Sequence, residues 1–260
     1  MKFLIGILYC GETQYEACKA AIEAQSHQEW ELFEVKNLPN HQAHQALFST
    51  FSDNADQFDA FVKIDADMEL CHKDFLAELA LYFTDHMQID HVTMKVDDFF
   101  TARHIWGLNA FRSSVVFSAG DAVYTDKVAE AEQSRRAHLK RHKALVPAAR
   151  HGFDPTEYQA FYFGCHKAVK VMHRQSRSHM RNIRRLPFAS LKRWDRRPLL
   201  AYAGAALAFK HKINADALDH DKSELRELFD TMMQSDRGLR LLDIWRCRAA
   251  IRQAQSLYLK

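Results

Sequence analysis

The 260-residue chain lacks a hydrophobic run long enough to cross a membrane, since its longest apolar stretch, residues 198–209, is about half the length that spanning needs. Its five cysteines have no regular spacing, so we expect reduced thiols and no disulfide framework. Internal repeats, low-complexity tracts and flexible linkers are also missing from the sequence. The sequence therefore predicts one large domain, or a domain with an appendage, that buries a substantial core.

A signal peptide is another feature that we do not find. The apolar run over residues 3–8 follows Met1 and Lys2, but this positive region is minimal and no small-residue cleavage site comes after it. We interpret the run as a buried strand. The protein is expected to be cytoplasmic and at most peripheral at the inner face of the membrane.

Short apolar runs alternate with segments of helical periodicity over residues 1–98. The strand-like runs cover residues 3–8, which are apolar throughout, and residues 30–35, 58–64 and 91–96, and helical spacing recurs over residues 15–25, 41–51 and 75–83. Strands that alternate with helices predict an α/β fold, in which helices cover both faces of a mostly parallel sheet.

Two carboxylates one residue apart, Asp65 and Asp67, come directly after the third apolar run. Side chains at positions i and i+2 of a strand share a face, and open α/β sheets bind ligands at the edge where their parallel strands end. Two oxygen ligands at that edge suit Mg²⁺ or Mn²⁺, which bind through one or two carboxylates together with substrate phosphates. The simplest substrate is a nucleotide diphosphate, and the alternative is an acidic turn without a ligand.

An ordered series of short motifs runs through residues 1–100. After a polar turn behind the first strand come Ala24-Gln25-Ser26, Trp30-Glu31, Asn37-Leu38-Pro39-Asn40, Ala43-His44-Gln45-Ala46 and Val62-Lys63-Ile64-Asp65-Ala66-Asp67-Met68. This series resembles the GT-A glycosyltransferases of the family 2 type. The resemblance implies a Rossmann-like sheet with flanking helices, a nucleotide-sugar donor and a Mn²⁺ or Mg²⁺ cofactor.

The strand ends and the resemblance together define an expected donor site. Metal ligation is assigned to Asp65 and Asp67. The residues expected to bind the nucleotide-sugar are Tyr9, Cys10, Gly11, Glu12, Asn37, Lys63, Asp65 and Lys167. Many relatives carry an acidic residue that contacts the base where this chain has Lys36 and Asn37, so the identity of the base stays open.

An inverting transfer needs a carboxylate that deprotonates the acceptor hydroxyl. Asp97 and Asp98 follow the fourth strand and are the nearest candidates, with Glu157 in reserve. The Glu-Asp pair that usually marks this base in the second half is not evident in this chain, so the stereochemistry stays open as well.

A second cluster of chemically active residues begins at His151 and continues through residues 152–167. Asp154 and Pro155 give a helix-start signal, with Asp154 as the cap and Pro155 at the first helical position. The resemblance implies a late histidine as a further metal ligand, and His166 matches that placement. Gly164 would allow close approach of a diphosphate and Lys167 would offset its charge. A packed, hydrogen-bonded histidine is the alternative for His166.

Charge is divided unevenly along the chain. Residues 1–130 carry a net charge of −12, whereas residues 131–260 carry +15, with the basic excess concentrated in residues 135–143 and 174–197. Phosphate, an anionic membrane surface, nucleic acid or no partner would each explain a basic face. No nucleic-acid-binding signature is present, and a lipid-linked acceptor favours the membrane.

The resulting hypothesis is a metal-dependent glycosyltransferase that acts on a surface glycan or a lipid-linked acceptor. Residues 1–170 would form the catalytic domain, with residues 1–130 as its acidic donor half, and residues 171–260 a basic helical region with helices over 199–212, from 223 and over 239–258. The alternatives are a phosphatase of the Asp-x-Asp nucleophile type and a non-catalytic protein that binds membrane or nucleic acid. The phosphatase is disfavoured because in such phosphatases the acidic pair follows the first strand, whereas Asp65 and Asp67 follow the third.

Overall fold

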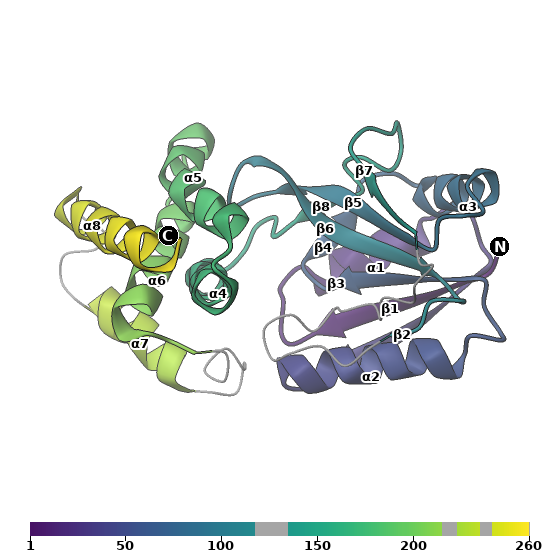
Figure 1. The fold of residues 1–260 in the computed structure, drawn as a ribbon, viewed down its shortest axis with the longest axis horizontal. Helices are drawn as coiled ribbons and strands as arrows, with labels where there is room; N and C mark the ends of the chain where they lie inside the picture. Colours follow the sequence, from purple (N-terminus) through teal and green to yellow (C-terminus); the bar gives the residue numbers. More distant parts are fainter. Residues whose placement is uncertain (118–134, 215–222, 235–240, 260) are drawn as a thin grey trace. The chain divides into compact units, whose positions relative to one another are not determined.

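The computed structural model describes residues 1–117, 135–214, 223–234 and 241–259, and it divides into two compact units (Figure 1). The first unit comprises Met1–Phe99 and Arg103–Asp154, and the second comprises Phe100–Ala102 and Pro155–Lys260. The division expected at residue 170 lies inside a helix of the second unit, α4 (Glu157–Arg174). The division expected near residue 130 lies outside the described residues.

A central sheet forms the first unit, and its described strands number eight. They are β1 (Phe3–Tyr9), β2 (Trp30–Lys36), β3 (Ala60–Asp65), β4 (Met68–Leu70), β5 (His91–Asp98), β6 (Arg103–Arg112), β7 (Arg136–Leu139) and β8 (Ala149–His151). Their order is β2-β1-β3-β6-β5-β8-β4, and β7 also pairs with β5. β6 runs antiparallel to both of its neighbours and β4 antiparallel to β8, whereas the other pairings are parallel. The expected α/β fold with a mostly parallel sheet is confirmed.

Helices cover both faces of this sheet, as the alternating pattern predicts. α1 (Tyr15–Glu23) and α3 (Phe75–Asp85) pack their apolar sides against one face, in a core that includes Ile5, Val62 and Met94. α2 (Asn40–Asp53) packs against the opposite face, where Phe51 stacks on Phe61 with ring centroids 4.7 Å apart. Because the sheet is buried from both sides, the ends of its parallel strands are the part left for ligands.

The second unit consists of helices (Figure 1). They are α4, α5 (Arg177–Arg193), α6 (Arg197–His211), α7 (Ser223–Gln234) and α8 (Leu241–Tyr258). The helices expected over residues 199–212, from 223 and over 239–258 are confirmed, with ends that differ by a few residues. Within the described ranges, no helix combines the length and the apolar character that crossing a bilayer requires.

Close packing of α4 on α6 depends on two glycines. A Cβ atom at Gly164 would lie 1.7 Å from the Ala201 carbonyl oxygen, and one at Gly204 would lie 2.2 Å from the Phe161 carbonyl oxygen. Cys165 donates a hydrogen bond to the Gly204 carbonyl across the same contact, with Sγ and oxygen 3.3 Å apart. The expectation that Gly164 makes room for a diphosphate is wrong, because α6 already occupies that space.

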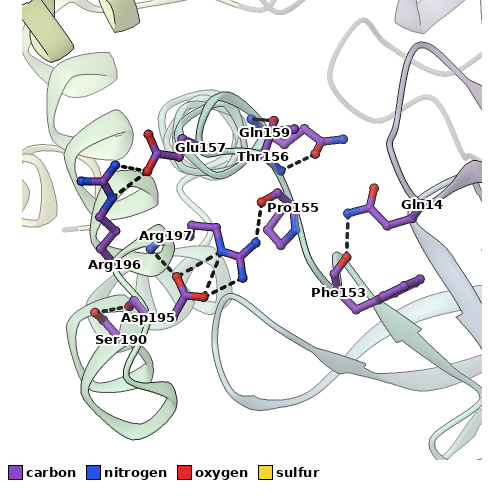
Figure 2. Close-up of polar contacts among 10 residues, drawn as sticks. All are labelled: Gln14, Phe153, Pro155, Thr156, Glu157, Gln159, Ser190, Asp195, Arg196 and Arg197. Atoms are coloured by element: carbon purple, nitrogen blue, oxygen red, sulfur yellow. Dashed lines mark hydrogen bonds and ion pairs between the residues drawn. The ribbon is translucent and has the colours of Figure 1, made fainter.

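The start of α4 also differs from the prediction. Its N-cap is Thr156, whose hydroxyl accepts from the backbone N–H of Gln159 while the Gln159 side chain accepts from the Thr156 N–H. This reciprocal pair is a capping box, and it satisfies two backbone donors at once (Figure 2). Asp154 lies two residues earlier with φ of 48°. The helix therefore begins later than the Asp154-Pro155 signal indicated.

Candidate functional site

The turn after β1 forms one side of the candidate site. Gly11 has φ of 98°, a backbone conformation that glycine adopts without steric cost. The Glu12 carboxylate folds back on this turn and accepts from the Cys10 backbone N–H at 2.7 Å and from the Cys10 thiol at 3.0 Å. Burial, and then the negative charge of Glu12, raise the pKa of the Cys10 thiol, so the thiol stays protonated. Both carboxylate oxygens of Glu12 thus accept hydrogen bonds within the turn.

The end of β2 is joined to the end of β1. The Asn37 backbone N–H donates to the Tyr9 carbonyl at 2.9 Å, and Asn37 has φ of 54°, which asparagine tolerates better than most residues. The Tyr9 ring lies 4.3 Å from the ring of Tyr15, measured between centroids. Tyr15 in turn bonds Glu34 through its hydroxyl. The strand ends predicted to line a nucleoside therefore lie next to one another.

Asp65 ends β3 beside a buried lysine. Lys63 Nζ lies 2.9 Å from Asp65 Oδ1, and the Lys63 side chain is only 6% exposed. The two share a side of the strand because they are two residues apart. Burial opposes ionisation of Asp65, but the Lys63 charge and hydrogen bond outweigh it, so the pKa of Asp65 lies below its usual value. Asp65 is therefore an anion with a fixed partner.

Asp67 belongs to a second group of side chains with His151 and Asp98. The His151 ring lies between the two carboxylates, with Nδ1 2.7 Å from Asp98 Oδ1 and Nε2 3.4 Å from Asp67 Oδ2. Asp98 is completely buried, His151 is 13% exposed and Asp67 is 25% exposed. Asp98 therefore orients His151, and His151 contacts the carboxylate that lies nearer the surface.

Strand pairing explains how His151 reaches Asp67. β4 and β8 are antiparallel, and Met68 pairs with His151. His151 therefore lies close to Asp67, which is the residue before Met68. The Gly152 backbone N–H also donates to the Asp67 carbonyl at 2.9 Å. The loop after β8 is held against α1 by Gln14, whose side-chain amide donates to the Phe153 carbonyl at 2.7 Å (Figure 2).

One oxygen of Asp67 is left unsatisfied. Asp67 Oδ1 is buried and has no hydrogen-bond partner among the described residues. Burial, together with the charges of Asp65, Glu12 and Asp98, raises the pKa of Asp67 to about 6 in spite of the opposing charge of His151. A buried carboxylate oxygen without a partner is costly, and a cation would satisfy it.

The donor set fits a hard divalent cation that is shared with a phosphate ligand. Within the part of the chain that the structure describes, no group of three or more His, Cys, Asp or Glu side chains is arranged to hold a metal ion by itself. Mg²⁺ and Mn²⁺ sites in phosphate-transfer enzymes need only one or two carboxylates, because substrate phosphates and water complete the coordination. Asp65 and Asp67 meet that requirement.

The other predicted residues fall in different places. Asp97 lies on the opposite face of β5 from Asp98, since successive side chains of a strand alternate. Glu157, His166 and Lys167 all lie on α4 in the second unit, where Glu157 accepts a hydrogen bond from Arg196 Nε at 2.6 Å (Figure 2). The roles proposed for these four residues stay predictions.

His151, Gln14 and Gly152 had no role predicted from the sequence. His151 and Gly152 begin the second cluster of chemically active residues, and the His-Gly-Phe-Asp sequence that they start is the one available signal. Nothing in the local sequence connects His151 with Asp67, because 84 positions separate them and only the pairing of two three-residue strands brings them together.

No protein-family model and no curated protein matches the chain. Similar solved structures include the mannosyltransferase PcManGT from Pyrobaculum calidifontis in complex with GDP-Man and Mn²⁺, at 13% identity and a TM-score of 0.43, covering 99% of this chain and 86% of that one. Another is S. aureus TarS 1–349, at 12% identity and a TM-score of 0.39, covering 99% and 91%. A third is A197 from STIV, at 12% identity and a TM-score of 0.36, covering 54% and 82%. Because these similarities are weak, the function is inferred from the residues of the site itself.

Proposed function

We propose that this protein is a metal-dependent glycosyltransferase that moves a sugar, of the hexose class, from a nucleotide-diphosphate sugar to a hydroxyl group. The observation that carries the proposal is the Asp65-Ala66-Asp67 turn at the end of a parallel strand, with a buried Asp67 oxygen that has no partner among the described residues. The resemblance of residues 1–100 to GT-A glycosyltransferases supports the same conclusion, and so does the α/β sheet.

Asp65 and Asp67 would hold Mn²⁺ or Mg²⁺ together with the donor diphosphate. When bound, the cation supplies positive charge where the departing diphosphate gains negative charge. Lys63 fixes the Asp65 carboxylate, and His151 fixes that of Asp67. The ends of β1 and β2, with Tyr9, Cys10, Gly11, Glu12 and Asn37, are proposed to line the nucleoside.

Acceptor activation is assigned to a carboxylate. Asp97, Asp98 and Glu157 are the proposed candidates, and complete burial of Asp98 favours a positioning role for it through His151. His166 and Lys167 are proposed as a further metal ligand and a phosphate contact. We propose a surface glycan or a lipid-linked glycan as the acceptor. We propose the inner face of a membrane as the location of the protein.

Calorimetric titration tests the donor site. UDP, GDP and CDP are each titrated into the wild type with and without Mn²⁺, and at least one of them is expected to bind only when Mn²⁺ is present. Asp67→Ala should abolish that binding, whereas Asp85→Ala, an exposed aspartate at the end of α3, should retain it. If a folded Asp67→Ala variant binds every nucleotide with the same affinity as the wild type does, the proposed site is refuted.

Product analysis separates this function from the hydrolase alternative. A nucleotide-sugar that binds in the titration is incubated with the protein and Mn²⁺, with and without a glycan acceptor. The transferase releases the nucleoside diphosphate and requires Asp65 and Asp67 for that release. Liberation of inorganic phosphate from phosphomonoesters, without any cleavage of nucleotide-sugars, would instead favour a phosphatase.

A further inference from the structure

α5 carries an unusually basic outer face. Residues 158–194 contain nine lysines and arginines and no aspartate or glutamate. Arg181, Arg184, Phe188 and Lys192 follow one another at spacings of three or four residues, so they share one face of the helix. All four are exposed, whereas the opposite face, which includes Ile183, is buried. The face is therefore directed to solvent and positively charged along its length.

Large apolar side chains interrupt this basic face near the end of α5. Phe188 is 58% exposed, Leu191 is 75% exposed and Trp194 is 96% exposed, which makes Trp194 the most exposed large apolar side chain in the described part of the chain. The Arg185 guanidinium lies 6.0 Å from the centroid of the Phe188 ring. The Nε atom of Arg185 has no hydrogen-bond partner among the described residues. Exposed aromatic residues within a basic helix are typical of helices that lie in the membrane interface.

Trp194 is held in its exposed position by the backbone. Its φ is 54°, in the left-handed region that bulky residues rarely adopt. The next residue is fixed on both sides, because the Asp195 N–H donates to the Ser190 carbonyl at 3.2 Å and the Ser190 hydroxyl donates to the Asp195 carbonyl at 2.5 Å (Figure 2). Trp194 therefore lies on an ordered turn at the end of α5, in the left-handed conformation that also ends α4 and α6.

The first acidic residue after α5 in the sequence, Asp195, is paired with an arginine of its own unit. Asp195 accepts hydrogen bonds from three groups of Arg197, the backbone N–H at 2.8 Å, Nε at 2.9 Å and Nη2 at 2.6 Å (Figure 2). Arg197 Nη1 also donates to the Pro155 carbonyl at 2.8 Å. Asp195 therefore subtracts little from the positive field of α5.

Arginines of α8 act on the same tyrosine as an arginine of α5. Burial raises the pKa of Tyr202 on α6, and the charges of Arg248, Arg252 and Arg184 oppose that shift. The arginines of α5 and α8 therefore act on the same tyrosine. Trp245 on α8 is also exposed, at 64%, with the Arg248 guanidinium 5.4 Å from its ring.

We propose that the outer face of α5, with Phe188, Leu191 and Trp194 among its arginines, is a docking surface for an anionic lipid bilayer. The arginines and Lys192 attract acidic headgroups, and the three apolar side chains enter the interface between headgroups and acyl chains. Acidic headgroups complement the positive charge, and the exposed Phe188, Leu191 and Trp194 favour a bilayer, which offers an apolar interior, over other polyanions. The surface stands on its own residues and does not depend on the proposed transferase activity.

Vesicle flotation tests this surface with the full-length protein. Wild type is expected to float with vesicles of phosphatidylserine and phosphatidylcholine, and to remain unbound with phosphatidylcholine alone. Raising the salt from 0.1 M to 1 M should release it, because the screening length falls from about 10 Å to about 3 Å. The variant Arg181→Gln, Arg184→Gln, Arg185→Gln should bind about 100-fold more weakly, since each lysine or arginine near such a membrane strengthens binding by about fivefold.

The apolar side chains need a separate variant and matched controls. The variant Phe188→Ser, Leu191→Ser, Trp194→Ser should lose binding although its arginines remain. Trp194→Phe should reduce the blue shift in tryptophan fluorescence that vesicles cause, because Trp194 is one of the four tryptophans of the chain. The matched controls are Leu81→Ser with Met87→Ser, which are exposed apolar residues of the first unit, and Lys73→Gln with Lys140→Gln and Arg141→Gln. Both control sets should bind vesicles as the wild type does.

Three outcomes would overturn the proposal. These are equal flotation of wild type and both α5 variants, equal binding to neutral and anionic vesicles, and salt-sensitive binding of single-stranded RNA with no binding of vesicles. Titration of the same variants with nucleotide and Mn²⁺ keeps the two proposals apart. Loss of vesicle binding with retained nucleotide binding supports the docking surface, and vesicle binding by a protein that binds no nucleotide refutes the proposed function alone.

Discussion

At the scale of single residues, the candidate site depends on side chains that hold other side chains in place. Lys63 orients Asp65, and Asp98 orients His151, which contacts Asp67. Partners of metal-binding carboxylates fix their geometry and tune their affinity, so their removal typically costs about 10- to 100-fold in metal affinity or activity. The same logic applies to a carboxylate pair that shares its cation with a diphosphate.

We therefore predict that His151→Asn weakens Mn²⁺-dependent nucleotide binding by about 10- to 100-fold. His72→Asn, a change at an exposed histidine of the same unit, should have no effect. Calorimetry measures both affinities, and thermal unfolding without metal shows whether each variant is folded. The Asp98→Asn change should weaken binding through His151, so the double variant should lose no more than His151→Asn alone. Additive losses would show that Asp98 does not act through His151.

At the scale of secondary-structure elements, periodicity predicted the first part of the sheet well. β1, β2, β3 and β5 are strand-like runs in the sequence, and the helices between them have one buried side. β6 gave no such signal, because it carries polar residues at its start and Gly107 at its centre. A Cβ at Gly107 would lie 2.7 Å from the Val96 side chain, so the glycine there reflects close contact within the sheet.

The candidate site was predictable only in part for a related reason. Asp65 and Asp67 are neighbours in sequence and follow one strand, so their position could be predicted from the strand alone. His151 reaches Asp67 through the pairing of β4 with β8, and each of these strands has three residues. Strands that short carry too little periodicity to be predicted, and their pairing depends on the packing of the whole unit.

For Gly164→Ala, the contact between α4 and α6 predicts a change in stability opposite to the one that helix propensity predicts. Helix propensity alone says that Gly164→Ala should stabilise the protein by about 1 kcal/mol. The structure predicts a loss of stability instead, because the new methyl group would overlap the Ala201 carbonyl and force the helices apart. We expect a loss of about 1–3 kcal/mol, which is typical of overpacking. Denaturant titration followed by the circular dichroism of the helices measures the change, and any gain in stability would contradict the packing described for α4 and α6.

At the scale of the whole molecule, charge follows the division into two units. The residues with the acidic excess build the sheet and its candidate metal site, and the basic excess belongs mainly to the helices. Positive charge within the helical unit also acts on its own buried groups. Burial, and then the charges of Lys167 and Lys170, lower the pKa of His179 on α5 to about 2. His179 therefore stays neutral in the folded protein at pH 5 and above.

The lowered pKa of His179 predicts how the molecule responds to acid. Below a pH of about 6.5 the unfolded chain binds a proton at this histidine and the folded chain does not, so the free energy of unfolding falls as the pH falls. Between pH 7.5 and pH 5 this cost should reach about 1–2 kcal/mol, and His179→Gln should remove it. Hydrogen exchange in α4–α6 at the two pH values measures the effect for the unit concerned.

Asp195→Asn provides the control, because its effect belongs to a different pH range. Burial opposes ionisation of Asp195, but its hydrogen bonds and ion pair with Arg197 outweigh burial, so the pKa of Asp195 lies below the ordinary value of 3.8. The stability that this pair contributes is present above that value and is lost as the pH falls through the lowered pKa. Asp195→Asn should therefore destabilise the helices equally at pH 7.5 and pH 5. If His179→Gln changes protection equally at both pH values as well, the histidine is not held neutral by burial.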